Sequence, residues 1–267
     1  MKFDLFVSDF DKTLGKLPEE IDESVVKAIK EYTAKGGKFA IATGRLYKSV
    51  KRICDKYGIK GLVASYQGAM ITDMGSEKTL FVSGIEPECA CEVAKRFEEE
   101  NLCVVADIDD NLYYDKENSY VTMYEDIIKI KAIKVDNIIE FIKNSKLPVL
   151  KLGGIGDTEI TERVIKEYPE KYKGQLLFNG GISHLVEVIT PEASKGEAVK
   201  FMANYYNIPL DRVLAVGDST NDVELIGGSW YGVCVGDGRD EAKAVADEIT
   251  VPFNEHPVKV LLEKYCL

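Results

Sequence analysis

Histidine is scarce in this chain of 267 residues, with only two present, and its six cysteines never form a Cys-x-x-Cys pair. A structural zinc site needs closely spaced Cys or His ligands, and a disulfide framework is typical of small secreted domains. The composition therefore argues against both, and the cysteines are interpreted as reduced thiols.

Long apolar runs are also missing, since no stretch approaches the length of a membrane-spanning helix. The first residues carry acids at Asp4 and Asp9, where a secretory signal would need an unbroken apolar segment. We therefore expect a soluble, cytoplasmic protein without a membrane partner.

Positive charge is in short supply, because 34 Lys and Arg stand against 45 Asp and Glu, for a formal net charge of -11. The basic residues are scattered, so long-range electrostatics oppose binding to nucleic acid, which is not expected as a partner. An anionic substrate would also be repelled at a distance. A site for one must therefore be locally positive through a metal ion, lysine or backbone N–H groups.

Apolar runs typical of buried strands alternate with amphipathic helices toward both ends of the sequence. A chain of this length favours two domains with separate cores. Strands are predicted at 3–7, 39–42, 62–65, 213–216 and 232–235, and helices at 22–35, 48–57, 195–206 and 222–226. Such strand–helix–strand units build parallel sheets, so we predict an α/β, Rossmann-like core.

Between about residues 84 and 187 the rhythm changes to helices beside short, turn-linked strands, which is typical of an α+β unit. Helices are expected at 87–101, 137–143 and 159–168, and strands at 103–106, 112–114, 149–152, 176–178 and 185–189. We predict that residues 1–83 and 188–267 form the catalytic core, and that residues 84–187 are an inserted cap domain.

Polar side chains follow the predicted core strands at the points where these strands end. Asp9 and Asp11 come after the first strand, Thr43 after the second and Asp218 after the 213–216 strand, while Lys195 opens a nearby helix. In open α/β sheets, ligands bind outside the carboxyl ends of the strands. These side chains are therefore expected to converge.

The two neighbouring carboxylates of Asp9 and Asp11 repel each other unless a cation or a shared proton neutralises them. Magnesium prefers such hard oxygen ligands, and Asp218 can complete the cluster. Phosphoryl transfer needs a nucleophile, a general acid and fixed positive charge. Asp9 can attack phosphorus, and Asp11 can protonate the leaving oxygen and then activate water.

Several donors could hold the remaining phosphate oxygens: Thr43, the Gly44 N–H, Lys195 and the Asn221 amide. Each motif by itself has an ordinary structural interpretation, since an isolated Asp-x-Asp is more often a turn or a cap. All of them, however, occur in order at strand ends or helix starts of one split α/β core. This conjunction favours a catalytic site.

The chain resembles the haloacid dehalogenase superfamily, specifically its Cof-type phosphatases with a large, C2B-like α/β cap. The resemblance lies in four motifs, which are Asp9-Phe10-Asp11-Lys12-Thr13-Leu14, Ile41-Ala42-Thr43-Gly44-Arg45, Ser194-Lys195-Gly196 and Gly217-Asp218-Ser219-Thr220-Asn221-Asp222. It implies that Asp9 is the nucleophile and a magnesium ligand, and that Asp11 is the acid/base whose backbone carbonyl also binds magnesium. Asp218 would be the third protein ligand.

The resemblance also implies roles around the phosphate and the substrate. The Phe10 N–H would join Thr43, Gly44, Lys195 and Asn221 in holding phosphate, with Asp222 in support, and the substrate contacts would come from Arg45 and Gln67. The insert would be a mobile cap that closes over the site and selects the substrate.

Three positions depart from the family pattern. Lys12 stands where the family usually has glycine, and Gln67-Gly68-Ala69 replaces an Asn-Gly-Ala element. Near the end of the chain, Gly236-Asp237-Gly238 replaces Gly-Asn-Ala.

The predicted function is magnesium-dependent hydrolysis of small phosphomonoesters, such as sugar phosphates or phosphorylated cofactors, through an aspartyl-phosphate. A sugar phosphomutase of the same superfamily stays open, and its product would be an isomerised sugar phosphate. A phospho-accepting regulatory module uses similar Asp, Thr and Lys residues, but such modules are about half this length or less and lack an insert. A silent binding protein would not need both Asp11 and Lys195. The sequence identifies neither the phosphorylated metabolite nor the oligomeric state.

Overall fold

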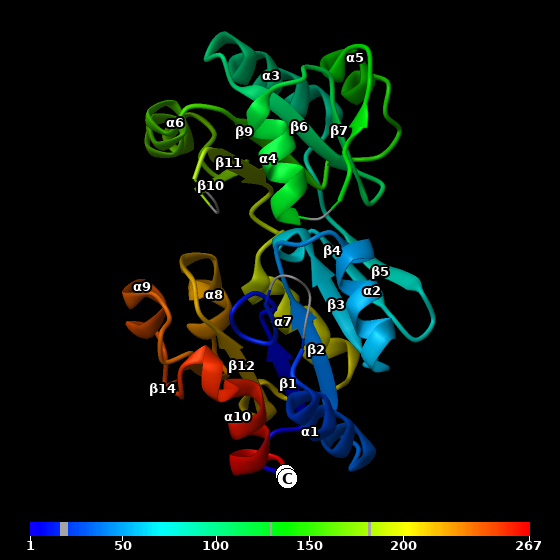
Figure 1. Ribbon diagram of the computed structural model, residues 1–267, viewed down its shortest axis with the longest axis vertical. Helices are drawn as coiled ribbons and strands as arrows, with labels where there is room; N and C mark the ends of the chain where they lie inside the picture. Colours follow the sequence, from blue (N-terminus) through cyan, green and yellow to red (C-terminus); the bar gives the residue numbers. More distant parts are fainter. Residues whose placement is uncertain (17–20, 129, 181–182) are drawn as a thin grey trace. The chain divides into compact units, whose positions relative to one another are not determined.

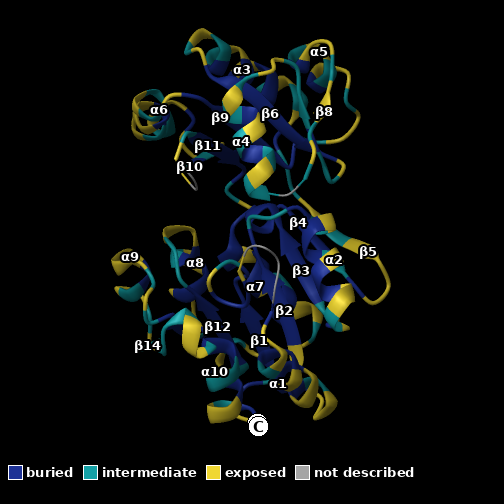
Figure 2. Ribbon diagram, in the orientation of Figure 1, coloured by how far each residue is buried: buried dark blue, intermediate teal, exposed yellow. Residues whose placement is uncertain are grey.

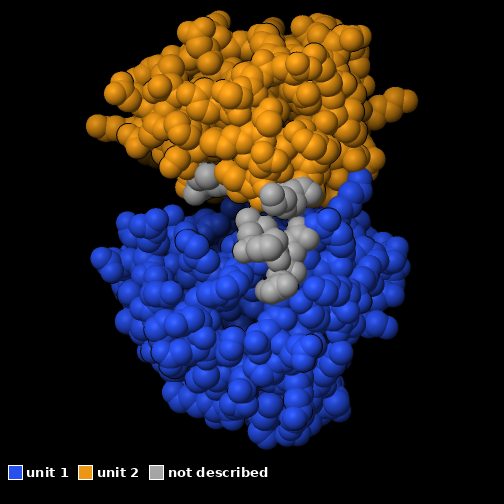
Figure 3. All heavy atoms as spheres, viewed as in Figure 1, with its two compact units in different colours: residues 1–81, 194–267 blue, residues 82–193 orange. Residues whose placement is uncertain are grey.

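The computed structural model describes residues 1–16, 21–128, 130–180 and 183–267 (Figure 1). The chain divides into two compact units, coloured separately in Figure 3. Unit 1 consists of residues 1–81 and 194–267, and unit 2 of residues 82–193. The predicted insert, 84–187, lies within unit 2. No described helix combines the length and the apolar character that crossing a bilayer requires.

Unit 1 is built on a sheet with the strand order β14-β13-β12-β1-β2-β3-β4-β5. Neighbouring strands from β14 to β3 run parallel, whereas β4 is antiparallel to β3. The strands are β1 (Leu5–Ser8), β2 (Lys38–Ala42), β3 (Leu62–Ser65), β4 (Met70–Asp73), β5 (Lys78–Val82), β12 (Val213–Gly217), β13 (Tyr231–Cys234) and β14 (Glu248–Ile249). The parallel arrangement confirms the predicted α/β fold class.

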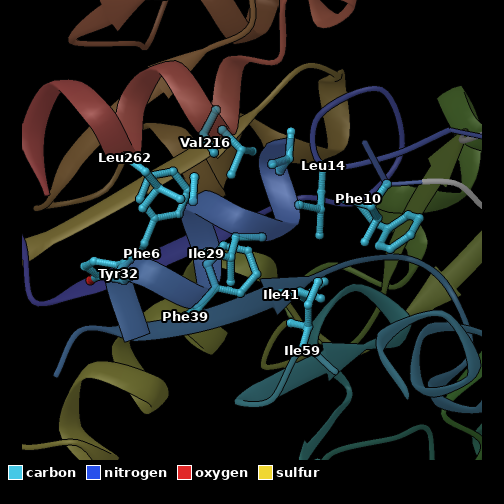
Figure 4. Packing of buried hydrophobic residues seen from close by; sticks show 14 of the residues in the cluster. Phe6, Phe10, Leu14, Ile29, Tyr32, Phe39, Ile41, Ile59, Val216 and Leu262 are labelled. Carbon is cyan, nitrogen blue, oxygen red and sulfur yellow. The ribbon is translucent and has the colours of Figure 1, made fainter. Parts of the chain in front are cut away.

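Helices cover both faces of this sheet, and alternate strand residues enter the two cores. Phe6 of β1 packs in one core with residues of α1, α2 and α10, including Ile29 and Leu262 (Figure 4). Leu5 and Val7, on the opposite face, pack against residues of α7 and α8. The helices are α1 (Glu23–Ala34), α2 (Tyr47–Tyr57), α7 (Lys195–Tyr205), α8 (Val223–Ile226), α9 (Asp240–Lys243) and α10 (Pro257–Tyr265).

Short 3-10 helices join several of these elements: η1 (Tyr66–Gly68), η2 (Leu210–Arg212), η3 (Thr220–Asp222) and η4 (Phe253–Glu255). Two of them, η1 and η3, follow strands β3 and β12 at the carboxyl edge of the sheet. Buried residues are concentrated along the central strands (Figure 2). The core therefore holds the strand ends in place, and the loops that follow them start from fixed positions.

Unit 2 has its own mixed sheet, with the order β10-β11-β9-β6-β7-β8. Its strands are β6 (Cys103–Ile108), β7 (Asn111–Tyr114), β8 (Ile133–Lys134), β9 (Lys151–Ile155), β10 (Leu177–Gly180) and β11 (Leu185–Ile189). They pair antiparallel, except that β8 runs parallel to β7. Its helices are α3 (Pro87–Glu99), α4 (Ser119–Ile128), α5 (Ile138–Lys143) and α6 (Thr158–Lys171).

Helix α4, like the two-residue strand β8, is an element of unit 2 that sequence patterns did not predict. Its sequence, SYVTMYEDII, is rich in aromatic and β-branched residues, which have modest helix propensity. Val121 and Tyr124 bury one side of it against sheet residues such as Val105 and Leu185. Tertiary packing therefore stabilises a helix that the local sequence favours only weakly.

A buried polar cluster lies between α4 and the sheet of unit 2. Lys151 Nζ is 2.7 Å from Glu187 Oε1, 3.8 Å from Asp107 Oδ2 and 3.3 Å from the Tyr124 hydroxyl. Asp107 is 1% exposed, and its Oδ1 has no hydrogen-bond partner among the described residues. Burial raises the pKa of Asp107 to about 7, although the nearby Lys151 ammonium opposes this shift.

This raised pKa predicts that unit 2 loses stability as Asp107 ionises. The stabilising contribution of Asp107 is complete below its ordinary pKa of 3.8 and disappears as the pH rises through about 7. Relative to wild type, Asp107→Asn should therefore gain about 4 kcal/mol of unfolding free energy between about pH 4 and pH 8. Urea unfolding across this range measures the difference. Asp136→Asn, at an exposed position of unit 2, is the control. If the difference in unfolding free energy between Asp107→Asn and wild type did not change with pH, the raised pKa of Asp107 would be contradicted.

Candidate active site

Three adjacent strands of unit 1 end at residues predicted to form the site. Asp9 follows β1, Thr43 follows β2 and Asp218 follows β12, and these strands are neighbours in the order β12-β1-β2. Ser8 is in register with Val216 and Ile41, so the strand ends are level. Backbone hydrogen bonds continue past the ends, from Asp9 N to Val216 O at 2.9 Å and from Thr43 N to Ala64 O at 2.8 Å. The sheet thus brings these segments to one edge.

Lys195 reaches this edge from the start of α7. Ser194 caps the helix, accepting a hydrogen bond from the Glu197 N–H through its hydroxyl. The Lys195 ammonium lies 2.6 Å from Asp9 Oδ1 and 2.5 Å from Asp222 Oδ1. All three side chains are buried. Residues separated by more than 180 positions therefore meet in one ionic cluster.

The electrostatics of the cluster favour an additional cation. Burial raises the pKa of Asp9 well above its ordinary value, as does the Asp222 carboxylate, while Lys195 opposes the shift. Burial and Asp222 raise the pKa of Asp218 to about 6. Burial alone would lower the pKa of Lys195, but Asp222 and Asp9 raise it above its ordinary value. One ammonium thus faces three acids, and a bound cation would relieve their repulsion.

The donor set fits a hard divalent cation. Carboxylate oxygens of Asp9, Asp218 and Asp222 lie within 4.8 Å of one another. Asp222 is already engaged, because Oδ1 accepts from Lys195 and Oδ2 accepts from the Asp218 and Ser219 N–H groups at 3.0 Å. It therefore holds Lys195 and the Asp218 loop together. Asp9 and Asp218 remain as the side chains that could bind a hard divalent ion.

Asp11 lies apart from this acidic cluster. Its carboxylate forms a two-pronged pair with Arg45, at 2.8 Å from Nε to Oδ2 and 2.7 Å from Nη2 to Oδ1. The Phe10 ring lies under this pair, with its centroid 4.5 Å from the guanidinium carbon. Asp9 and Asp11 are two residues apart, yet each has its own cationic partner.

Lys12, which replaces the usual glycine, has φ of 57°. This left-handed conformation is readily adopted by glycine and costs other residues about 1 kcal/mol. Its N–H donates to Gly15 O at 2.8 Å, which closes the turn after Asp11. The substitution therefore retains the turn conformation that explains a glycine preference.

Three of the predicted phosphate-binding residues lie beside η1: Thr43, Gly44 and Asn221. Thr43 is buried, and its hydroxyl accepts from the Arg45 N–H at 3.2 Å. Asn221 Nδ2 donates to Gln67 Oε1 at 3.2 Å. A Cβ on Gly44 would lie 2.6 Å from Gln67 Nε2, so a side chain at Gly44 would displace Gln67. Thr43, Gly44, Asn221 and Gln67 are thus neighbours at this edge.

The backbone at Gln67 is strained. Tyr66 and Gln67 have φ values of 54° and 62°, a region that non-glycine residues rarely adopt. A Cβ on Gly68 would lie 2.5 Å from Ser194 O, so only glycine allows η1 to approach the start of α7 so closely. Such strain is concentrated at functional sites and must be stabilised by surrounding contacts.

Two further contacts at Asp218 had no role in the sequence interpretation. The Thr13 hydroxyl donates to Asp218 Oδ1 at 3.3 Å, and the Arg239 N–H donates to Asp218 O at 2.7 Å. Asp237, in the element that departs from the family pattern, accepts instead from the Phe253 N–H at 2.9 Å. The threonine of D-x-D-x-T was a visible signal for the first contact. The contact from the Arg239 N–H depends on the loop after β13 packing against the Asp218 loop, which no local sequence pattern predicts.

Comparison with known proteins gives a consistent result. The haloacid dehalogenase-like hydrolase family model matches residues 6–262. Phosphatase YwpJ of Bacillus subtilis is 23% identical over 97% of this chain and 98% of its own length. The chloroplastic endoribonuclease YBEY of Arabidopsis thaliana is 26% identical over 99% of this chain, but the match covers 47% of that protein, so this chain spans about half its length.

Among solved structures, a haloacid dehalogenase-like hydrolase from Bacteroides thetaiotaomicron shares the fold with a TM-score of 0.87 at 20% identity. The match covers 98% of this chain and 99% of that one. The family predicted from the four motifs is confirmed by the match along almost the whole sequence. This chain belongs to the haloacid dehalogenase-like hydrolases.

Proposed function

We propose that this protein is a magnesium-dependent phosphatase acting on small phosphomonoesters, such as sugar phosphates or phosphorylated cofactors. The observation that carries the proposal is the buried pairing of Asp9 with Lys195, 2.6 Å apart, beside Asp218 at the carboxyl edge of the sheet. A carboxylate next to fixed positive charge can attack an anionic phosphoryl group, whose own charge the ammonium offsets. The kinship with Phosphatase YwpJ supports the same activity.

The reaction would proceed in two transfers. In the first, an Asp9 oxygen attacks phosphorus, the ester P–O bond breaks, and the Asp11 carboxyl gives its proton to the leaving oxygen. In the second, a water oxygen attacks the aspartyl-phosphate, its proton passes to the Asp11 carboxylate, and inorganic phosphate leaves. Asp9 is restored as a carboxylate.

The remaining groups would hold the transferring phosphoryl group. Its oxygens would accept from the Thr43 hydroxyl, the N–H groups of Phe10 and Gly44, and the Asn221 amide. Magnesium, held by Asp9, Asp218 and the Asp11 carbonyl, would supply charge neutralisation during transfer. In this proposal unit 1 is the catalytic core, and unit 2 is the cap that selects a small phosphorylated metabolite in the cytoplasm. Unit 2 also argues against a phospho-accepting regulatory module.

A panel of phosphorylated metabolites tests this function. We expect release of free inorganic phosphate from at least one sugar phosphate or phosphorylated cofactor. Chelation of divalent ions should lower the rate of release by at least about 100-fold, and added magnesium should restore it. An isomerised sugar phosphate without free phosphate would indicate a phosphomutase. Failure to turn over any member, with or without magnesium, would contradict the proposal.

Metal binding has its own measurement, independent of turnover. Because a ligand of the folded state stabilises it, magnesium should raise the melting temperature of the protein. Asp218→Asn should weaken this shift, whereas Asp136→Asn, at an exposed position of unit 2, should leave it unchanged. Equal shifts in both variants would place the ion elsewhere.

A further inference from the structure

Arg45 is fixed by contacts that do not involve Asp11. Its guanidinium stacks on the Phe10 ring, and Nη1 lies 3.5 Å from the hydroxyl of Ser49 in α2. The Arg45 side chain is 12% exposed, whereas that of Asp11 is 49% exposed. The arginine is thus the anchored member of the pair, and the aspartate is the member with room to move.

The pair also separates the two carboxylates of the Asp-x-Asp motif. A planar guanidinium fork orients a carboxylate through two parallel hydrogen bonds, which a lysine ammonium cannot do. Among the described residues, the acidic group that could hold an ion contains Asp9, Asp218 and Asp222 but not the Asp11 side chain. Without the fork, the Asp11 carboxylate could turn toward a cation at Asp9, and a metal-bound carboxylate would be unable to deliver a proton.

We propose that Arg45 is a positioning residue for Asp11. It keeps the Asp11 carboxylate out of the metal-ligand set and aims it for proton transfer, an inference that rests on the proposed phosphatase function. Both carboxylate oxygens are engaged in the pair, so one hydrogen bond must open when the Asp11 carboxyl carries its proton. The remaining hydrogen bond to Arg45 keeps the Asp11 carboxyl in place while it carries the proton. As the P–O bond breaks, that proton passes to the leaving oxygen and the two-pronged pair can form again.

Aryl phosphates with phenols of graded pKa test this role, because kcat/KM reports the steps up to release of the leaving group. A good leaving group needs little help from a general acid, while a poor one depends on it. We therefore expect Arg45→Ala to reduce kcat/KM about 10- to 100-fold more for phenyl phosphate than for p-nitrophenyl phosphate. Arg45→Lys should show a similar imbalance, since it keeps the charge and loses the fork. Added guanidine should partly rescue Arg45→Ala.

Asp11→Asn provides the decisive background. If Arg45 acts through Asp11, its removal has no further effect once the Asp11 carboxyl is gone. In the Asp11→Asn variant, Arg45→Ala should therefore leave the dependence of kcat/KM on the leaving-group pKa unchanged. Arg52→Ala, which removes an exposed arginine from helix α2, the helix that follows Arg45, is the matched control and should leave the dependence unchanged.

The possible outcomes separate three explanations. An equal loss of kcat/KM for all esters in both Arg45 variants would overturn the proposal, because a phosphate contact or a folding defect acts alike on every substrate. The proposal would also be overturned if Arg45→Ala steepened the leaving-group dependence as much in the Asp11→Asn variant as in wild type. If wild-type protein hydrolysed no aryl or alkyl phosphate, the proposed function itself would fail, which is a different result from an unchanged leaving-group dependence.

Discussion

Asp9→Asn is expected to lower phosphate release at least about 10⁴-fold, because an amide cannot act as the attacking carboxylate. The substitution nearly conserves the side-chain volume and can keep a hydrogen bond from Lys195, which lies 2.6 Å from Asp9 Oδ1. The fold should therefore persist while the chemistry is lost. Acid-quenched reactions should contain phosphorylated wild-type protein and none of the Asn variant.

Asp11→Asn is the matched comparison for this experiment. It lacks the group that activates water, so it should accumulate phosphorylated protein with an activated ester such as p-nitrophenyl phosphate. Phosphorylation at Asp9 would then be trapped directly. If Asp9→Asn instead kept most of the wild-type turnover, the covalent mechanism would be wrong.

Lys195→Met is expected to impair both stability and activity. The Lys195 ammonium lies between the buried carboxylates of Asp9 and Asp222, and its removal leaves them facing each other without compensation. Breaking a buried ion pair in this way costs about 3–5 kcal/mol. Turnover should also fall about 10²- to 10³-fold, because the phosphoryl oxygens lose their fixed positive charge.

Urea unfolding followed by tryptophan fluorescence can measure this loss of stability. The single tryptophan, Trp230, is buried in unit 1 and donates to Leu225 O at 2.7 Å, so it reports on the unit that contains Lys195. The destabilisation should shrink as the pH falls, since protonation of Asp9 removes one uncompensated charge. Lys200→Met, at an exposed position of the same helix, should change stability little. An equally small effect at Lys195 would contradict the expected buried ion pair.

Sequence patterns predicted the central strands of unit 1 well, because these strands are continuous apolar runs that follow from burial on both faces. They failed for elements that depend on distant partners. Strands β8 and β14 have two residues each, too few for any period to be visible. Helix α4 has weak local propensity and depends on the sheet beneath Val121 and Tyr124.

In the candidate site, the residue types were visible in the sequence, but only some of their partners were. Lys195 was predicted near Asp9, since both stand at the carboxyl edge of a parallel sheet, and the structure places them in contact. Nothing local indicated that Arg45 pairs with Asp11, or that Gln67 contacts Asn221 through a strained turn. Those pairings arise from distances between loops, and hydrogen bonds form according to such distances rather than according to spacing along the chain.

The sequence by itself determined the family, the parallel α/β core and the set of chemically capable side chains, because strand periodicity and motif order are local properties of the chain. Only the tertiary structure decided how two carboxylates of the same type differ. The Asp9 side chain is 7% exposed and paired with Lys195, whereas the Asp11 side chain is 49% exposed and paired with Arg45. Desolvation and the nearest cation set the charge state and orientation of a carboxylate, and both depend on atoms brought close only by folding.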